Sequence, residues 1–160
     1  MPEGSLNKKL SKMISKLSNK YSSPKFRPHV TLAGGFGGEK KELAAKAKIL
    51  SRSLKPFEAR LTRVRCLDEF FRSLFVLVEK TPEIMTAHRV ARNLFGMPRH
   101  DYLPHLSLIY GKFSASQKRE MMKETGKRFD ASFTARKICL VLNKEQGRKS
   151  KWTAIRGFRL

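Results

Sequence analysis

Two short segments of this 160-residue chain carry the same arrangement of residue types. Each has a proline, then a histidine, then a hydroxyl residue two positions later: Pro28-His29-Val30-Thr31-Leu32 and Pro104-His105-Leu106-Ser107-Leu108. An imidazole has a reference pKa of about 6.5, so near neutral pH one ring can accept a proton while another donates one. Hydroxyls can donate hydrogen bonds to phosphate oxygens. Together these side chains are suited to cleaving a cyclic phosphodiester by acid–base catalysis.

Alternation of polar and apolar residues predicts a short strand for each segment. In a strand, His29 and Thr31 point to one face, as do His105 and Ser107. The apolar residues point to the opposite face, and those expected in the core are Val30, Leu32, Leu106 and Leu108. If the two strands meet, one groove receives both imidazoles and both hydroxyls.

The same order of elements surrounds both segments. Apolar periodicity predicts helices over 6–20, 39–54, 82–94 and 115–128. Strands are predicted over 57–66, 72–79, 132–143 and 151–160. Thr81 is a suitable N-cap for the third helix, and Pro82 suits its first position. Each half of the chain thus reads helix, Pro-His strand, helix, strand, strand.

This repeat predicts an α+β fold of two pseudo-symmetric lobes, each with an antiparallel sheet and outer helices. The active site is expected in the central groove between the lobes. We expect a single domain over 1–160. One lobe comprises about 1–71 and an exchanged C-terminal strand, and the other comprises 72–160.

A formal charge of +22 points to an anionic partner. There are 35 Lys and Arg residues against 13 Asp and Glu, while residues 66–110 are neutral overall. Such a surplus attracts phosphate-bearing ligands, but it does not separate RNA from a nucleotide or a membrane surface. The basic run 144–151 is predicted to be a charged hairpin loop that could contact an RNA backbone.

Composition excludes several other classes of protein. The apolar runs are shorter than the roughly 20 residues of a membrane helix, and the N-terminus does not resemble a secretory signal. Cys66 and Cys139 are too few for a disulfide framework and lack metal-ligand spacing. We expect a folded monomer in the cytoplasm, or in the nucleus of a eukaryote, without membrane contact.

The two motifs, with Ile109-Tyr110-Gly111 after the second, resemble the paired signatures of the two-histidine (2H) phosphoesterase superfamily. Within it, the chain is most similar to the cyclic phosphodiesterases of plants and yeast. The segments 69–77 and 81–85 also resemble that group. The resemblance implies a bilobal fold and catalysis without a metal or other cofactor. It also implies substrates with a 2′,3′-cyclic phosphate or an ADP-ribose 1″,2″-cyclic phosphate.

The resemblance also implies roles for individual residues. Those that would take the catalytic roles are His29, Thr31, His105 and Ser107. Tyr110 and Phe71 match positions that line the groove near the substrate base or phosphate. Spacing does not decide which histidine is the base. Members of the group begin with a strand that is not seen here, so either the true start lies upstream of Met1 or the first lobe's sheet has an uncovered edge.

Three functions are compatible with these observations. The first is a metal-independent cyclic phosphodiesterase acting on a nucleotide, ADP-ribose cyclic phosphate or an RNA end. The second is an RNA-end enzyme of the same fold, either a 2′–5′ ligase or a 3′ exonuclease, which the charge favours. The third is a non-catalytic basic RNA-binding module. His88 and His100 are expected to be ordinary packed or surface residues, and Gly34–Gly38 a flexible turn.

Overall fold

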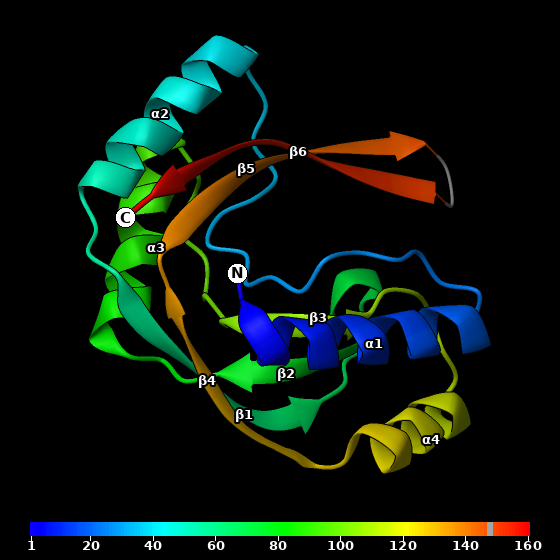
Figure 1. Ribbon diagram of the computed structural model, residues 1–160. Coiled ribbons are helices and arrows are strands. Elements are labelled where there is room, and N and C mark those ends of the chain that lie inside the picture. The colour runs from blue at the N-terminus through cyan, green and yellow to red at the C-terminus, as the bar shows by residue number, and fades with distance from the viewer. Residues whose placement is uncertain (147–148) are drawn as a thin grey trace.

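Two antiparallel sheets of unequal size form the framework of the protein (Figure 1). The computed structural model describes residues 1–146 and 149–160. The larger sheet has the strand order β3-β2-β1-β4, with β1 at Phe57–Arg65, β2 at Leu74–Val78, β3 at His105–Ile109 and β4 at Arg128–Ala135. The smaller sheet pairs β5, Lys137–Gln146, with β6, Lys149–Arg159.

Four helices cover these sheets. Helices α1, Gly4–Lys20, and α4, Ala115–Thr125, pack on the larger sheet, while α2, Lys40–Arg52, packs on β5 and β6. Helix α3, Pro82–Leu94, contacts α2 and β1. Local sequence explains where α3 begins, because the Thr81 hydroxyl accepts a hydrogen bond from the backbone N–H of Ile84 and Pro82 takes the first helical position. A short 3-10 turn, η1 at Phe70–Arg72, precedes β2.

Each sheet has its own apolar core. The core of the larger sheet is built by residues from α1, α3, α4 and all four strands, among them Leu10, Leu17, Leu61, Val76, Ile84, Leu106, Leu108 and Met121. The core of the smaller sheet lies against α2 and contains Leu43, Ala47, Leu140 and Phe158. The predicted α+β class, with antiparallel sheets and outer helices, is confirmed.

Elements from both sides of residue 71 meet at the larger sheet. Strand β1 pairs with β2 and β4, so it lies inside the larger sheet, and helix α1 packs against the same sheet through β3. Helix α3 contacts α2 and also supplies Ile84 to the core of the larger sheet. Strands that follow one another along a chain usually pair, which is why β1 joins β2. The sequence repeat therefore does not coincide with the two structural layers.

The segment around His29 is not a strand, contrary to the prediction. Within residues 28–32, Val30 forms an isolated bridge with Leu106, and no ladder extends from it in the described part of the chain. Pro28 has no N–H to donate, and Gly35 has φ 79°, so the backbone turns away soon after the motif. The second motif, in contrast, lies within β3.

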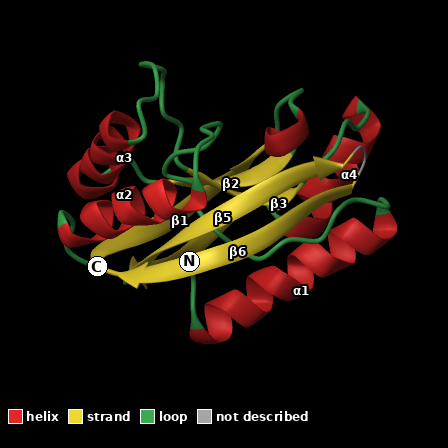
Figure 2. Cartoon of the chain, turned by 90° about the horizontal axis from the view of Figure 1, so that it is seen from above, coloured by secondary structure: helices red, strands yellow, loops and turns green. Residues whose placement is uncertain are grey.

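The C-terminal strands also differ from the prediction. The strand expected over 132–143 is divided between β4 and β5, which belong to different sheets. The hairpin loop expected over 144–151 is shorter, because β5 and β6 pair as far as Gln146 and Lys149, and 147–148 lie outside the described residues. Figure 2 shows this long hairpin crossing over the larger sheet. No helix in the described ranges is long and apolar enough to cross a membrane.

Candidate active site

The bridge between Val30 and Leu106 sets the two histidine motifs side by side and antiparallel. In that register, His29 lies opposite Ser107, and Thr31 lies opposite His105. Alternate residues of an extended chain point to opposite faces, so these four side chains share one face. Leu106 is fully buried on the other face. Each imidazole is therefore placed across from the hydroxyl residue of the other motif.

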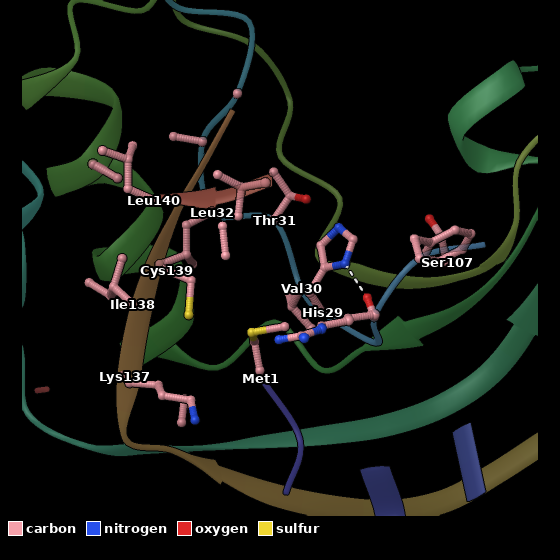
Figure 3. Close-up of a pocket in the computed structure, with 18 of the residues that line it drawn as sticks. Met1, His29, Val30, Thr31, Leu32, Ser107, Lys137, Ile138, Cys139 and Leu140 are labelled. Carbon is pink, nitrogen blue, oxygen red and sulfur yellow. Dashed lines mark hydrogen bonds between the residues drawn. The ribbon is translucent and has the colours of Figure 1, made fainter. Parts of the chain in front are cut away.

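One groove of about 1620 Å³ collects all six residues singled out from the sequence. Its lining includes His29, Thr31, Phe71, His105, Ser107 and Tyr110. Figure 3 shows His29, Thr31 and Ser107 along one part of the groove, and the β5 residues from Lys137 to Leu140 along another. The connection between α1 and α2, which carries His29, runs through the space between the two sheets (Figure 1).

Both imidazoles make the same local hydrogen bond. His29 Nδ1 lies 2.6 Å from the carbonyl oxygen of Arg27, and His105 Nδ1 lies 2.7 Å from that of Leu103. A carbonyl oxygen can only accept, so Nδ1 carries the proton and donates in both rings. In the neutral ring Nε2 is then the proton acceptor, and after protonation it becomes a donor. The two motifs thus have the same tautomer.

The groove lowers the pKa of both histidines. Burial is the main cause for His29; the hydrogen bond to Arg27 opposes it, and the charges of the N-terminal amine and His105 lower the pKa further. Burial is also the main cause for His105, where Arg72 lowers the pKa further and Glu69 raises it. Arg72 and Glu69 form an ion pair at 2.6 Å, so their effects on His105 partly cancel. Both rings therefore lose their second proton at a lower pH than a free imidazole does.

The two hydroxyls have different surroundings. Ser107 is only 5% exposed, and its hydroxyl donates to the carbonyl oxygen of Phe71 at 2.9 Å. A serine has one hydroxyl proton, so the Ser107 O–H must turn away from the Phe71 carbonyl before it can donate to a phosphate. Thr31, in contrast, is exposed in the groove. Of the two, Thr31 is the better placed to bind a ligand directly.

The aromatic residues of the groove form a small cluster. Phe71 is 41% exposed, whereas Tyr110 is nearly buried, and their rings meet edge to face with centroids 5.3 Å apart. Phe26 stacks on Tyr110 at 4.0 Å and also lines the groove. The sequence prediction missed Phe26. The signal that could have found it is an aromatic residue between two basic ones, three positions before His29.

Positive side chains accompany this cluster. Lys25, Arg27 and Arg72 line the groove, which suits an anionic ligand. Over the ranges 1–146 and 149–160, no three His, Cys, Asp or Glu side chains gather in a group that could hold a metal ion. Besides the imidazoles, hydroxyls and cations, the groove lining includes the Glu69 carboxylate, which is paired with Arg72.

Comparison with known families identifies the group to which this fold belongs. The model of the 2′-5′ RNA ligase superfamily matches residues 6–147. The chain belongs to this superfamily. The predicted membership in the 2H phosphoesterases is therefore confirmed. Among curated relatives, the cyclic phosphodiesterase of Arabidopsis thaliana is 28% identical over 125 residues, which cover 78% of this chain and 69% of that protein.

Solved structures show the same superfamily fold. The protein TT0787 of Thermus thermophilus superposes with a TM-score of 0.69 at 18% identity, covering 100% of this chain and 93% of that one. LigT of E. coli, solved in complex with 3′-AMP, gives a TM-score of 0.66 at 14% identity, covering 95% and 91%. At such identities the likeness establishes the fold. Superfamily membership and the plant relative together support a phosphoesterase.

Proposed function

We propose that this 2H phosphoesterase is a cyclic phosphodiesterase that opens 2′,3′-cyclic phosphates by acid–base catalysis with two histidines. The observation that carries the proposal is the antiparallel bridge at Val30 and Leu106, which brings two imidazoles of the same tautomer to one groove. Substrates of this class include cyclic nucleotides, ADP-ribose 1″,2″-cyclic phosphate and RNA ends.

The chemical step uses the Nε2 atoms of His29 and His105. One Nε2 takes a proton from water as the water oxygen bonds to phosphorus. The bond between phosphorus and a ring oxygen breaks, and the other histidine, protonated beforehand, gives its proton to the leaving alkoxide. The products are a phosphomonoester and a free hydroxyl. Thr31 and a rotated Ser107 stabilise the charge that develops on the phosphoryl oxygens, so the step requires no metal ion.

Replacing each histidine tests this proposal. His29→Ala and His105→Ala should each lower kcat on 2′,3′-cyclic AMP by about 10²–10⁴, because each removes one acid–base group. His100→Ala is a control for losing an imidazole outside the groove lining. Because the His100 ring meets that of His88 edge to face at 5.2 Å, Tyr21→Phe, which removes a hydroxyl that donates to Glu120, is measured beside it. Unchanged turnover in both active-site variants would contradict the proposal. EDTA should leave turnover intact, and a loss restored by a divalent cation would indicate a metal mechanism instead.

A basic surface next to the groove favours an RNA end as the substrate. Lys25 and Arg27 line the groove, and Arg27 also borders a neighbouring hollow of about 400 Å³ that contains Lys8 and Lys137. Lys137 is paired with Glu3 at 2.8 Å, whereas Lys8, Lys25 and Arg27 form no ion pair with the side chains that the structure describes, so these three supply most of the positive field. A single strand could follow these cations away from the catalytic groups.

Salt dependence separates RNA from mononucleotide substrates. KM should rise more steeply with salt for a short RNA with a 2′,3′-cyclic end than for 2′,3′-cyclic AMP, because each additional phosphate contact adds about 0.7 to the log–log slope. Equal slopes would contradict the RNA-end assignment. Joining of the cyclic end to a 5′-hydroxyl strand would instead identify a ligase. RNA affinity without turnover, unchanged by loss of both histidines, would identify a binding module.

A further inference from the structure

The backbone of the first motif is held by side chains from elsewhere in the fold. Its single bridge at Val30 is followed by a glycine-rich turn, so a sheet does not hold Thr31 in place. However, two consecutive carbonyl oxygens accept hydrogen bonds. The Tyr102 hydroxyl donates to Thr31 O at 2.9 Å, and His88 Nδ1 donates to Leu32 O at 2.7 Å.

The side chains of His88 and Tyr102, which donate these two hydrogen bonds, also contact each other. The rings of His88 and Tyr102 stack almost in parallel, with centroids 3.9 Å apart and 6° between their planes. His88 comes from α3, and Tyr102 comes from the connection before β3, so the pair joins two separate elements to the first motif. Burial raises the pKa of the Tyr102 phenol, which therefore remains neutral and keeps its donating proton.

His88 is a poor choice for packing alone. It is only 4% exposed, and among the described residues its Nε2 is buried without a hydrogen-bond partner. A buried polar atom without a partner destabilises the fold, so an apolar side chain of similar size would serve a core better. The hydrogen bond from Nδ1 to the carbonyl oxygen of Leu32 explains why a histidine is buried here although its Nε2 has no partner among the described residues.

We propose that His88 and Tyr102 are a positioning pair that orients the peptide groups of Thr31 and Leu32, so that the Thr31 hydroxyl faces the groove. Neither ring lines the groove, whereas Thr31 does, so the pair acts through Thr31. The proposal rests on the proposed function, in which Thr31 stabilises the phosphoryl oxygens. Misplacing a catalytic group by about 1 Å can cost about 10²-fold in rate, so a lost carbonyl anchor should be visible in kcat.

Tyr102→Phe is the direct test, because it removes the hydroxyl and keeps the stacked ring. We expect kcat on 2′,3′-cyclic AMP to fall by about tenfold to a hundredfold, with KM changed by less than about threefold. Tyr21→Phe is the matched control: the Tyr21 hydroxyl donates to Glu120 at 3.0 Å, away from the groove lining, and its loss should leave kcat unchanged. Equal kcat in Tyr102→Phe and wild type would overturn the proposal.

Substitutions at His88 separate positioning from packing. His88→Asn keeps an N–H donor near the place of Nδ1 and should retain most of the wild-type kcat. His88→Leu preserves the apolar volume but lacks the donor, so it should lose kcat about as Tyr102→Phe does while melting at least as high as His88→Asn. If kcat instead follows the melting temperature across these variants, the pair is merely structural.

A double substitution tests whether the effect passes through Thr31. In a Thr31→Ala background, adding Tyr102→Phe should lower kcat by less than about threefold, because the group that it positions is already gone. Fully additive losses would contradict the proposal.

Failure of the proposed function would be recognised separately, as absent turnover in the wild-type protein. In that case ¹H–¹⁵N spectra still test the pair: Tyr102→Phe should shift the amide signals of residues 31–35 and leave those of 106–109 in place. Unmoved signals at 31–35 would refute the positioning pair.

Discussion

The two histidine motifs contain the same chemical groups but are held in different ways. The second motif lies in β3, where a ladder pairs His105 with Leu77 and Ser107 with Phe75 of β2. The first has one bridge, at Val30, and two side-chain donors on its backbone. The contrast shows that a repeated motif does not imply a repeated support. The second is fixed by the sheet and the first by long-range contacts.

The largest effect should come from removing both histidines together. If His29 and His105 act in one step, the double alanine variant should have nearly the same kcat as the worse single variant, because either loss alone breaks the proton transfer. Single-turnover rates on 2′,3′-cyclic AMP would measure this. If the fold-losses in kcat of the two single variants multiply in the double variant, the two histidines act independently and not in one step.

Core substitutions should separate the motifs by stability. Leu106→Ala should lower the free energy of unfolding by about 2–5 kcal/mol, because Leu106 is fully buried in the sheet. Val30→Ala should cost less than half as much, since Val30 is only half-buried and loses two methyl groups. Urea denaturation measures both values. Equal costs would mean that the first motif is as firmly built into the core as the second.

The two hydroxyls should also differ in kinetics. Thr31→Ala should lower kcat about tenfold to a hundredfold with little change in KM, as expected when one hydrogen bond to a charged transition state is lost. Ser107→Ala should change kcat and KM together, because it also releases the carbonyl of Phe71, whose exposed ring lines the groove. Steady-state kinetics on 2′,3′-cyclic AMP would compare them, and identical profiles would contradict this difference.

A smaller, more specific effect is expected in the titration of the rings. Both histidine pKa values are lowered, so both limbs of the pH profile of kcat/KM should lie below about 6.5. Arg72→Ala removes a cation that lowers the pKa of His105 and leaves Glu69 to raise it, so His105 should titrate at higher pH. His29 lies beside a ring that then keeps its charge to higher pH, so it should titrate at the same pH or a lower one. NMR titration of the imidazole protons tests this, and a shift of His29 alone would contradict it.

Local patterns predicted the helices, the strand of the second motif and the superfamily. Caps and periodicity are local, so the first helical position of α3 could be predicted from Thr81 and Pro82. The groups needed for chemistry also stand out in the sequence, because Pro-His followed by a hydroxyl occurs twice. These features do not depend on which elements pack together.

The missing parts depend on contacts between distant segments. The strand predicted around His29 fails because its neighbours do not continue the ladder, which alternation within the segment cannot reveal. The sequence predicts His88 to be an ordinary packed or surface residue. It is buried, but the carbonyl that it contacts lies 56 positions away. Phe26 likewise enters the groove through its stacking with Tyr110, a partner far along the chain.

The short hydrogen bond from each histidine to the carbonyl two residues earlier has a consequence for how such a site can change over time. The contact is contained within three consecutive residues, at His29 as at His105. It persists in the first motif although strand pairing there is reduced to one bridge. A histidine that is oriented by its own local backbone does not depend on the element around it. A loop can therefore replace a strand while the same ring nitrogen, Nε2, still faces the substrate.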